Sequence, residues 1–593
     1  MDTITRIFDL LEHSRNNCQK PDMVACRHNG AWKLCSTDEF LDLTDNLSRG
    51  LISLGVVKDD KVAIMSTNRP EWNICDFAIM QIGATQVPMY PTLAENDIRY
   101  ILSDAEIKIV FVSDQVLYEK LDKARKQMES DLVIYTFEEV TGADNWTKVL
   151  DLGKQNPDTD LKAYQNQVSP DDLLTLIYTS GTTGTPKGVM LTHRNLVSNV
   201  VESSVMYPAG FKKALSFLPL SHIFERMVIY MYLYLGVSIY YAESMETIVA
   251  DIADVKPHGF TAVPRLLEKV YDRIVAKGSA LTGIKRTLFF CALNLGLNYE
   301  LEGKNGILYE LKLKLANKLI FNKWRDALGG NILALVSGGA ALQPRLAKVF
   351  WAAKMPVLEG YGLTETSPVI AVNGLNIGQA MFGTVGKAIK DVEVKIAADG
   401  EILCKGPNVM KGYYKNPAAT AEAIDAEGFF HTGDIGELID GKYLKITDRK
   451  KEIFKTAGGK YVAPQVLENK FKESIFIEQM MVLGENQRFP SALIVPSFLN
   501  LKDWCQRAEI PFISNSEIIK HPAVLEKVQG EINHYNQDFG QWERVKKFVL
   551  LPAEWSIEGG ELTPKLSLKR KFIFDKYKSH IDTIYKNSER IEI

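Results

Sequence analysis

The stretch YTSGTTGTPKGVMLTHRN, Tyr178–Asn195, concentrates glycine, hydroxyl side chains and one lysine in a short segment. Glycine lets a ligand approach the backbone closely, and consecutive N–H groups in such a loop can cradle an anion. Ser180, Thr182 and Thr183 add hydroxyl donors, and Lys187 adds a full positive charge. A flexible surface linker is the alternative, but this density of donors favours a loop that holds phosphate oxygens.

The residues around this loop indicate the fold that carries it. The preceding run LLTLIY, Leu173–Tyr178, is apolar and predicts a buried strand. A loop that leaves such a strand lies at the edge of an open α/β sheet, where these folds bind ligands. The pattern G-x-x-x-x-G-K-[ST] is not met, because Pro186 precedes the lysine and Gly188 follows it. We therefore expect a phosphate loop of another class.

The whole chain has 593 residues, too many for one hydrophobic core, so two or more domains are expected. Its formal net charge of −3 gives no basic footprint for nucleic acid. The seven cysteines include no C-x-x-C pair, which indicates a reducing compartment and argues against a structural zinc site. The N-terminus lacks the apolar run of a signal peptide, and we expect a cytoplasmic protein.

One apolar segment, Met227–Ala242, requires a choice between two readings. Its sixteen uncharged residues fall short of the roughly 20 that span a bilayer, and Gly236 lies midway. A buried helix that runs into a strand fits this length better than a membrane span.

Secondary-structure patterns change along the chain. Residues 1–170 alternate helical and strand patterns, including a helix over Thr37–Gly55, which implies an α/β domain with layered, parallel sheets. Residues 279–328 predict mainly helix, and YELKLKLANKLIFNKWRDAL within them is strongly amphipathic. Past Gly378, apolar and polar residues alternate between turns, which predicts short antiparallel strands. Charges cluster at Asp448–Glu452 between two strand-like runs, and we expect the interdomain boundary there.

Four further motifs follow the phosphate loop in order. They are LVSGGAALQP (Leu335–Pro344), EGYGLTETSP (Glu359–Pro368), FHTGDIG (Phe430–Gly436) and DRKKEIFKTAGGKYVAP (Asp448–Pro464). Together the five motifs resemble the adenylate-forming superfamily of acyl-CoA synthetases, luciferases and peptide-synthetase adenylation domains. LPLSHIFER, Leu218–Arg226, and the helical insert at 279–328 look most like the long-chain fatty acyl-CoA synthetase branch.

The resemblance implies a particular domain arrangement. A large N-terminal domain, residues 1–447, contains layered α/β sheets and a small β-rich subdomain. Residues 448–452 form a hinge around Lys451, and residues 453–593 form a small mobile α+β domain. Lys455, Gly458 and Gly459 serve the coenzyme A step by this resemblance.

The resemblance also implies a reaction in two steps that uses ATP, Mg²⁺ and coenzyme A. A fatty acid carboxylate attacks the α-phosphate of ATP, and the thiolate of coenzyme A then attacks the acyl carbon and releases AMP. Two alternatives remain. A fatty acyl-AMP ligase that loads a carrier protein usually carries an insertion, and none is evident after Lys455. A catalytically dead acyl-nucleotide sensor is expected to lack Lys187 or Glu365, and both are present. Acyl chain length, saturation and oligomeric state stay open.

Site residues follow from the same resemblance. Lys187 and its loop hold the β- and γ-phosphates, Thr364 donates to the α-phosphate, and Glu365 binds Mg²⁺. A Thr-Glu pair is otherwise common as a helix cap, but its place directly after GYG favours the site. The implied ATP-binding set is Thr179, Ser180, Gly181, Thr182, Thr183, Gly184, Lys187, Gly338, Gly339, Ala340, Glu359, Gly360, Tyr361, Gly362, Thr364, Asp434 and Arg449.

The nucleoside and acyl ends of the site are also implied. Tyr361 stacks on adenine, and Asp434 and Arg449 reach the ribose, although an acid in TGD is otherwise a common turn residue. His222 lines the acyl side, although a histidine beside an apolar run is often a core residue. Four residues later, where some relatives carry an aromatic gate to the acyl tunnel, this chain has Arg226. Both residues are expected in the acyl pocket, but the same gate is not assumed.

The C-terminal motif departs from the family pattern T-P-T-L-K-x-K-R. This chain reads LTPKLSLKRK, Leu562–Lys571, with Ser567 at the usual position of the catalytic lysine. On an extended strand Lys565, Ser567 and Lys569 would point to the same face. Each lysine would lie two residues, about 7 Å, from Ser567. We expect Lys565 to take over the catalytic role, and the alternative is a solvated strand lysine.

The lipid substrate implies at most a transient contact with the inner membrane face, since no basic amphipathic anchor is obvious.

Overall fold

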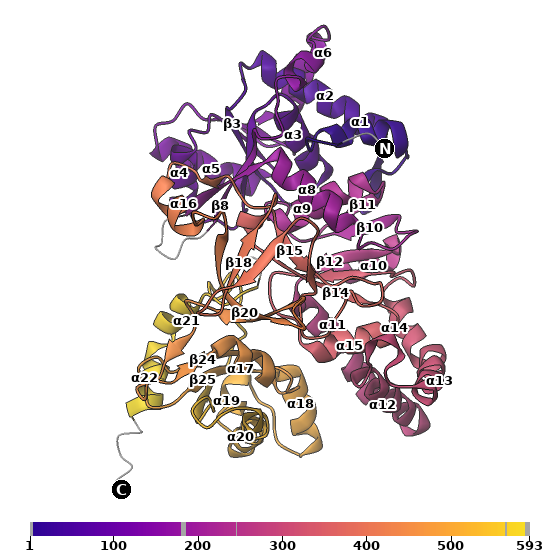
Figure 1. Cartoon of the computed structure of the whole chain (residues 1–593), viewed down its shortest axis with the longest axis vertical. Helices are drawn as coiled ribbons and strands as arrows, with labels where there is room; N and C mark the ends of the chain where they lie inside the picture. Colours follow the sequence, from indigo (N-terminus) through magenta and orange to yellow (C-terminus); the bar gives the residue numbers. More distant parts are fainter. Residues whose placement is uncertain (1–3, 180–185, 245, 564–565, 587–593) are drawn as a thin grey trace.

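The computed structural model describes residues 4–179, 186–244, 246–563 and 566–586. Figure 1 shows an elongated molecule in which the N-terminal half lies at the top and the C-terminal domain hangs below it. The helical insert forms a separate lobe at the lower right, opposite the C-terminal domain. The fold is mixed α/β, as predicted.

The phosphate loop belongs to an eight-stranded sheet of the described residues. In sheet order the strands are β19 (Gly412–Tyr413), β9 (Lys187–Thr192), β8 (Leu173–Thr179), β4 (Thr85–Met89), β3 (Lys61–Met65), β5 (Ile109–Val112), β6 (Val133–Thr136) and β7 (Asp144–Asn145). Strands β8, β4, β3, β5 and β6 pair in parallel, whereas β8 and β9 pair antiparallel. The predicted strand before the loop is therefore confirmed as β8, with its central residues buried.

A second sheet contains nine strands of the described residues. Their order is β16 (Lys387–Ala388), β15 (Val369–Val372), β14 (Val357–Gly362), β13 (Leu335–Ser337), β12 (Gly259–Ala262), β10 (Lys213–Ser216), β11 (Ser238–Tyr241), β1 (Val24–His28) and β2 (Ala31–Cys35). The run from β14 to β1 is parallel. The motifs LVSGGAALQP and EGYGLTETSP therefore lie at the ends of the adjacent strands β13 and β14.

Helices pack on these sheets. They are α1 (Asp9–Asn17), α2 (Thr37–Ser53), α3 (Pro70–Gln81), α4 (Glu95–Asp104), α5 (Gln115–Gln127), α6 (Thr147–Gln155), α7 (Leu161–Gln165), α8 (His193–Ser204), α9 (Ile223–Tyr234), α10 (Ile248–Val255), α11 (Pro264–Ser279), α12 (Gly283–Leu297), α13 (Ile307–Ala316), α14 (Asn322–Ala327), α15 (Pro344–Ala352) and α16 (Pro417–Ala423), with the short turns η1 (Leu301–Gly303), η2 (Asn317–Phe321) and η3 (Thr364–Thr366). Helix α2 begins where the Ser36 side chain accepts a hydrogen bond from Glu39 N at 3.1 Å. It ends before Gly55, whose φ of 85° closes the helix.

The apolar segment Met227–Ala242 forms the end of α9 and the buried strand β11, as predicted. No helix among the described residues has the length and apolar character needed to cross a bilayer. The insert at 279–328 is helical, as predicted, and contains α12, α13 and α14.

The segment past Gly378 forms the expected antiparallel strands. They are β17 (Glu393–Ile396), β18 (Glu401–Lys405), β20 (Phe430–Ile439) and β21 (Tyr443–Arg449). The C-terminal domain then contains β22 (Phe454–Lys455), β23 (Tyr461–Val462), β24 (Ile477–Leu483), β25 (Ser491–Pro496), β26 (Lys547–Leu550), α17 (Pro464–Phe471), α18 (Phe498–Arg507), α19 (Asn515–Ile518), α20 (Pro522–Tyr535), η4 (Asn536–Asp538), α21 (Arg570–Lys576) and α22 (Lys578–Lys586). This domain has its own core and an α+β composition.

Polar contacts join the C-terminal domain to the large domain. Arg265 on α11 pairs with Glu478 on β24, and Gln343 Nε2 donates to Lys472 O at 3.3 Å. All seven cysteines are free thiols, and Cys291 on α12 is the exposed one. The remaining six are buried or half-buried.

Candidate active site

A cavity of about 1980 Å³ lies between the large domain and the C-terminal segment. Its walls come from strand ends and loops of both large sheets and from the small β-sheet. Fifteen residues predicted from the motifs line it, namely Thr179, Lys187, His222, Gly338, Gly339, Ala340, Glu359, Gly360, Tyr361, Gly362, Thr364, Glu365, Asp434, Arg449 and Lys451. The motifs that are separated in the sequence therefore meet at one site.

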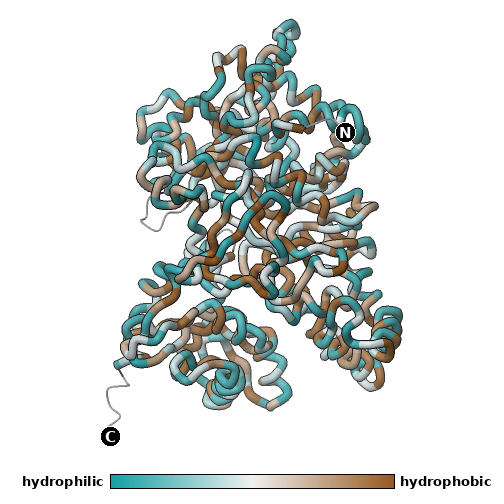
Figure 2. The backbone as a smooth tube through the Cα atoms, viewed as in Figure 1, coloured by the Kyte–Doolittle hydropathy of each residue, from teal (hydrophilic) through white to brown (hydrophobic). Residues whose placement is uncertain are grey.

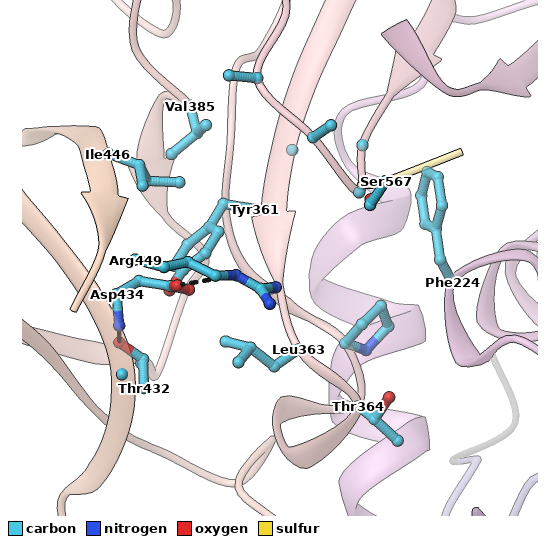
Figure 3. Close-up of a pocket in the computed structure, with 18 of the residues that line it drawn as sticks. Phe224, Tyr361, Leu363, Thr364, Val385, Thr432, Asp434, Ile446, Arg449 and Ser567 are labelled. Carbon is cyan, nitrogen blue, oxygen red and sulfur yellow. Dashed lines mark hydrogen bonds and ion pairs between the residues drawn. The ribbon is translucent and has the colours of Figure 1, made fainter. Parts of the chain in front are cut away.

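Tyr361, Asp434 and Arg449 form the first cluster in this cavity (Figure 3). The Tyr361 hydroxyl donates to Asp434 Oδ2 at 2.7 Å, and Arg449 Nε lies 3.6 Å from Asp434 Oδ1. Burial raises the pKa of the Asp434 carboxyl, and the nearby Arg449 opposes that shift. Burial also raises the pKa of Tyr361 well above its usual value, so the phenol stays protonated as a donor. The cluster offers a flat ring beside a carboxylate and a guanidinium.

Two positions in this wall, Gly339 and Gly362, require glycine for steric reasons. Gly339 has a φ of 82°, a left-handed conformation that other residues adopt at a cost. A Cβ at Gly362 would lie 1.7 Å from Pro368 O, so no side chain fits between the two segments. The neighbouring Glu359 is buried, and desolvation raises the pKa of its carboxyl to about 8. This wall therefore presents backbone and a neutral acid to the cavity at pH 7.

Lys187, Glu365 and Thr364 form a second cluster, and Tyr413 joins it. The Tyr413 hydroxyl donates to Glu365 Oε1 at 3.0 Å, and Lys187 Nζ lies 4.9 Å from the centre of the Tyr413 ring. Neither Lys187 nor Glu365 forms an ion pair with a described residue. Sequence analysis missed Tyr413. The register of β19 on β9 sets Tyr413 opposite Val189, and no local motif around Tyr413 predicts that pairing.

Some predicted site residues lie outside the described residues. They are Ser180, Gly181, Thr182, Thr183 and Gly184 of the phosphate loop, and the proposed catalytic Lys565. Thr179 and Lys187, which flank the loop, pair across β8 and β9 and line the cavity.

His222 lines the cavity and lies at the start of α9. Its Nδ1 accepts the Phe224 backbone N–H at 3.0 Å and so caps the first turn of α9. Phe224 also lines the cavity, and Figure 3 shows it on the side of the cavity opposite the Tyr361 cluster. Apolar and aromatic side chains also line the cavity, namely Met206, Tyr207, Met227, Val228, Met231, Val336, Leu358, Val369 and Val372.

The prediction that Arg226 lies in the acyl pocket is wrong. Arg226 is fully buried and does not line the cavity. Its guanidinium pairs with Asp76 on α3 and donates to Thr175 Oγ1 at 2.7 Å and to the Tyr230 hydroxyl at 2.7 Å. One helical turn after His222, the α9 surface faces the core between α3 and β8, where a buried cation needs these partners.

The C-terminal segment closes one side of the cavity with Ser567 and Lys569. The extended strand expected here is wrong, because Leu562 and Leu568 form an antiparallel bridge and Thr563 N donates to Ser567 O at 2.9 Å. Leu566 also has a positive φ of 62°. Ser567 and Lys569 both line the cavity, and Lys565 lies outside the described residues. Ser567 and Phe224 both line the cavity, and Figure 3 draws them on the side away from the Tyr361 cluster.

The residues predicted for the coenzyme A step lie apart from this cavity. Lys455, Gly458 and Gly459 belong to the β22–β23 hairpin and do not line it. Lys455 Nζ lies 4.7 Å from the centre of the Tyr461 ring on the same hairpin.

Comparison with known proteins agrees with this geometry. Residues 13–414 match the model of the AMP-binding enzyme family, and residues 452–589 match the AMP-binding enzyme C-terminal domain. The long-chain-fatty-acid–CoA ligase FadD15 of Mycobacterium bovis is 34% identical over 97% of this chain and 96% of its own length. The human long-chain-fatty-acid–CoA ligase 1 is 33% identical over 93% of this chain and 82% of its own.

Among solved structures, the adenylation domain of a carboxylate reductase from Mycobacterium chelonae has a TM-score of 0.76 at 21% identity. It covers 99% of this chain and 92% of its own, which shows the shared fold. The chain is a member of the AMP-binding enzyme family.

Proposed function

We propose that this protein is an AMP-forming long-chain fatty acid–CoA ligase. The observation that carries the proposal is a single cavity whose lining contains two charged clusters, His222 and a set of apolar side chains. A nucleotide and a fatty acid can therefore meet head to head in it. Relatives named long-chain-fatty-acid–CoA ligases match nearly the whole chain, which supports the same assignment.

The Tyr361 cluster fits a nucleoside. Tyr361 would stack on adenine along the glycine wall, and Asp434 would accept hydrogen bonds from the ribose hydroxyls. The Arg449 guanidinium, 63% exposed and loosely paired with Asp434, would turn to the same ribose. Because Tyr361 orients the Asp434 carboxylate before the ligand arrives, little reorganisation is required on binding.

The second cluster fits a polyphosphate. Lys187, with the loop from Thr179, would hold the β- and γ-phosphates and orient pyrophosphate as the leaving group. Thr364 would donate to the α-phosphate. The fatty acid carboxylate oxygen then attacks the α-phosphorus, and the bond from that phosphorus to pyrophosphate breaks. The approach of two anions requires the cation and donors that this cluster supplies.

The Glu365 carboxylate fits Mg²⁺. No group of three or more His, Cys, Asp or Glu within the described ranges could hold a metal ion by itself. Mg²⁺ is usually bound by one or two carboxylates together with substrate phosphates, so a single carboxylate beside Lys187 suits it. The ion would withdraw charge from the phosphate oxygens.

The domain division expected from the sequence becomes part of the proposal. Residues 1–447 would form the large domain, 448–452 the hinge around Lys451, and 453–593 the mobile domain. In the described orientation Ser567 and Lys569 face the cavity and the Lys455 hairpin does not, which suits the adenylation step. A rotation of the small domain would then bring Lys455, Gly458 and Gly459 in for the attack of coenzyme A on the acyl carbon.

The partners of the protein follow from this reaction. They are the small molecules fatty acid, ATP and coenzyme A, without nucleic acid. We propose a cytoplasmic enzyme that contacts the inner membrane face transiently to obtain its lipid substrate.

A panel of carboxylic acids, each with and without coenzyme A, tests the function. We expect pyrophosphate release with long-chain acids and acyl-CoA formation when coenzyme A is present. Highest kcat/KM with acetate would refute the long-chain assignment. Pyrophosphate release that yields acyl-AMP but never acyl-CoA would indicate a ligase that loads a carrier protein, and no release would indicate a sensor.

A further inference from the structure

Helix α13 and the turn η2 carry two apolar faces. The inner face packs on the large domain through the buried residues Leu313, Ala316 and Phe321. The outer face holds five apolar side chains that are 42 to 81% exposed. We call these residues the outer strip: Ile307, Leu308, Leu311, Leu315 and Leu319.

Lysines flank the outer strip. At about 100° per residue, the strip falls within an arc of about 120° on one side of the helix. Lys314 lies at one margin and Lys312 at the other, and Lys318 follows Lys314 one turn later, just inside the edge of the strip. All three lysines are exposed. A core helix has one apolar face and a polar opposite face, so an apolar outer face rimmed by cations requires another explanation.

The local charge is positive although the chain is acidic. Residues 279–328 contain eight Lys and Arg and four Asp and Glu, a net of +4, whereas the whole chain carries −3. Two of these acids are already engaged, because Glu300 pairs with Lys348 and Glu302 accepts Gly378 N at 2.6 Å. The lobe therefore presents a cationic margin to any approaching surface.

The lobe stands at the edge of the molecule. Figure 1 shows α13 at the outer right margin, and Figure 2 shows brown hydrophobic segments mixed with teal along the same lobe. Single exposed apolar residues are common on soluble proteins, but five on one helix face form a continuous patch.

We propose that the outer strip of α13 docks on an anionic lipid bilayer. The leucine side chains would enter the boundary between headgroups and acyl chains, and the lysine stems would extend along them to reach lipid phosphates. The sequence expectation that no basic amphipathic anchor is obvious depended on the residue pattern alone, which did not show which apolar residues face outward.

The outer strip is the surface that would make the membrane contact proposed above. The proposed ligase function explains why the protein would dock on a membrane, but the docking itself does not require that function. Long-chain fatty acids reside in membranes, so docking would place the enzyme at its substrate. The geometry of the strip is independent of the active site, because none of its residues lines the cavity.

Vesicle flotation of the full-length protein tests this docking. The vesicles contain phosphatidylcholine with or without phosphatidylglycerol. We expect binding to the anionic vesicles, and a loss of about 10²-fold or more in the partition coefficient for the triple variant Leu308→Gln, Leu311→Gln and Leu315→Gln. The triple variant Lys312→Gln, Lys314→Gln and Lys318→Gln should lose about 10²-fold on anionic vesicles and little on neutral ones.

A matched control replaces equally exposed apolar residues elsewhere, Val116→Gln, Leu499→Gln and Ile513→Gln. This variant should bind vesicles as the unaltered protein does. Ligase activity on a water-soluble medium-chain acid should be the same in all variants, which shows that they fold.

Equal vesicle binding by the leucine variant and the control would overturn the proposal, as would an absence of binding by the unaltered protein. A dimer in solution that the leucine variant abolishes, without vesicle binding, would assign the strip to a second copy of the chain instead. If the proposed ligase function is wrong, every variant and the unaltered protein will lack activity. Vesicle binding would still test the docking proposal in that case.

Discussion

Arg226 and Lys187 are cations of the same domain with opposite surroundings. Arg226 is fully buried, and its guanidinium is matched by the Asp76 carboxylate and two hydroxyl groups. Lys187 lines the cavity, where its described neighbours offer it an aromatic ring, Tyr413, and no carboxylate within ion-pair distance. Glu365 accepts a hydrogen bond from the hydroxyl group of the same tyrosine.

Arg226 is a charged group that stabilises the fold, whereas Lys187 and Glu365 are charged groups that remain available to bind a ligand. A buried ion pair whose hydrogen bonds are complete has no capacity left for substrate, and removing one partner leaves a costly buried charge. A cation and a carboxylate that both contact Tyr413 without pairing with each other can each bind part of an anionic substrate and its metal ion. Loss of the first kind should affect stability, and loss of the second should affect rate.

The largest effect is expected from Arg226→Met. It leaves Asp76 buried without its cation, and we expect the free energy of unfolding to fall by about 3–5 kcal/mol. Urea titration measures the loss. The double variant Arg226→Met with Asp76→Leu is the control, and it should recover most of the stability. An unchanged unfolding curve for the single variant would remove Arg226 from the role of a structural cation.

Glu365→Gln should act on rate alone. We expect the adenylation rate to fall by about 10²-fold, as for other important electrostatic groups, with little change in thermal stability. Pyrophosphate exchange measures the rate, and Glu422→Gln, another carboxylate that lines the cavity, is the matched control. Near-normal exchange in Glu365→Gln would contradict the metal-binding role.

The C-terminal lysines sharpen the comparison, because a cation there would complete the site from the small domain. We expect Lys565→Ala to slow adenylation by about tenfold, a smaller effect than that of Glu365 since lysine carries its charge on a long four-carbon stem. Thioester formation from supplied acyl-AMP should persist. Lys569→Ala, measured in both half-reactions, is the comparison. If only Lys569→Ala slows adenylation, the role belongs to Lys569; if neither does, the chain works without this lysine.

The smallest effect concerns Glu225, the neighbour of Arg226. It is fully buried and faces hydroxyls instead of a cation: Ser216 Oγ donates to Oε1 at 2.6 Å, and Thr261 Oγ1 donates to Oε2. Burial raises the pKa of its carboxyl from 4.5 to about 7.

The native state therefore holds an extra proton between these pH values, and its stabilising effect is lost as the pH rises through about 7. We expect stability to fall by about 1 kcal/mol between pH 6 and pH 7, and Glu225→Gln to flatten that change. Urea titrations of both proteins across this range provide the measurement. An equally steep change in the variant would assign the effect to another group.

Local patterns predicted the elements well. The apolar run at β8 and the helix that ends at Gly55 each depend on residues close in sequence, and the structure agrees with both. The ordered motifs likewise predicted that Tyr361, Asp434 and Glu365 would share one site, and they line one cavity.

Features that depend on packing between distant segments could not be predicted. Arg226 was misplaced because only the fold brings Asp76 of α3 beside α9. Tyr413 was missed because only strand register brings it to Lys187. The alternation of residue types around Ser567 resembled that of an extended strand. Leu562 and Leu568 instead form an antiparallel bridge, so the chain runs in opposite directions at these two residues.

The distribution of thiols gives the protein a built-in attachment point. Cys291 is the exposed cysteine, and α12, which carries it, packs beside α13. Thiol reactivity requires access, so a maleimide dye should label this helix in preference to the buried cysteines. An environment-sensitive fluorophore on the native chain would then report by its emission colour whether the helical lobe leaves water.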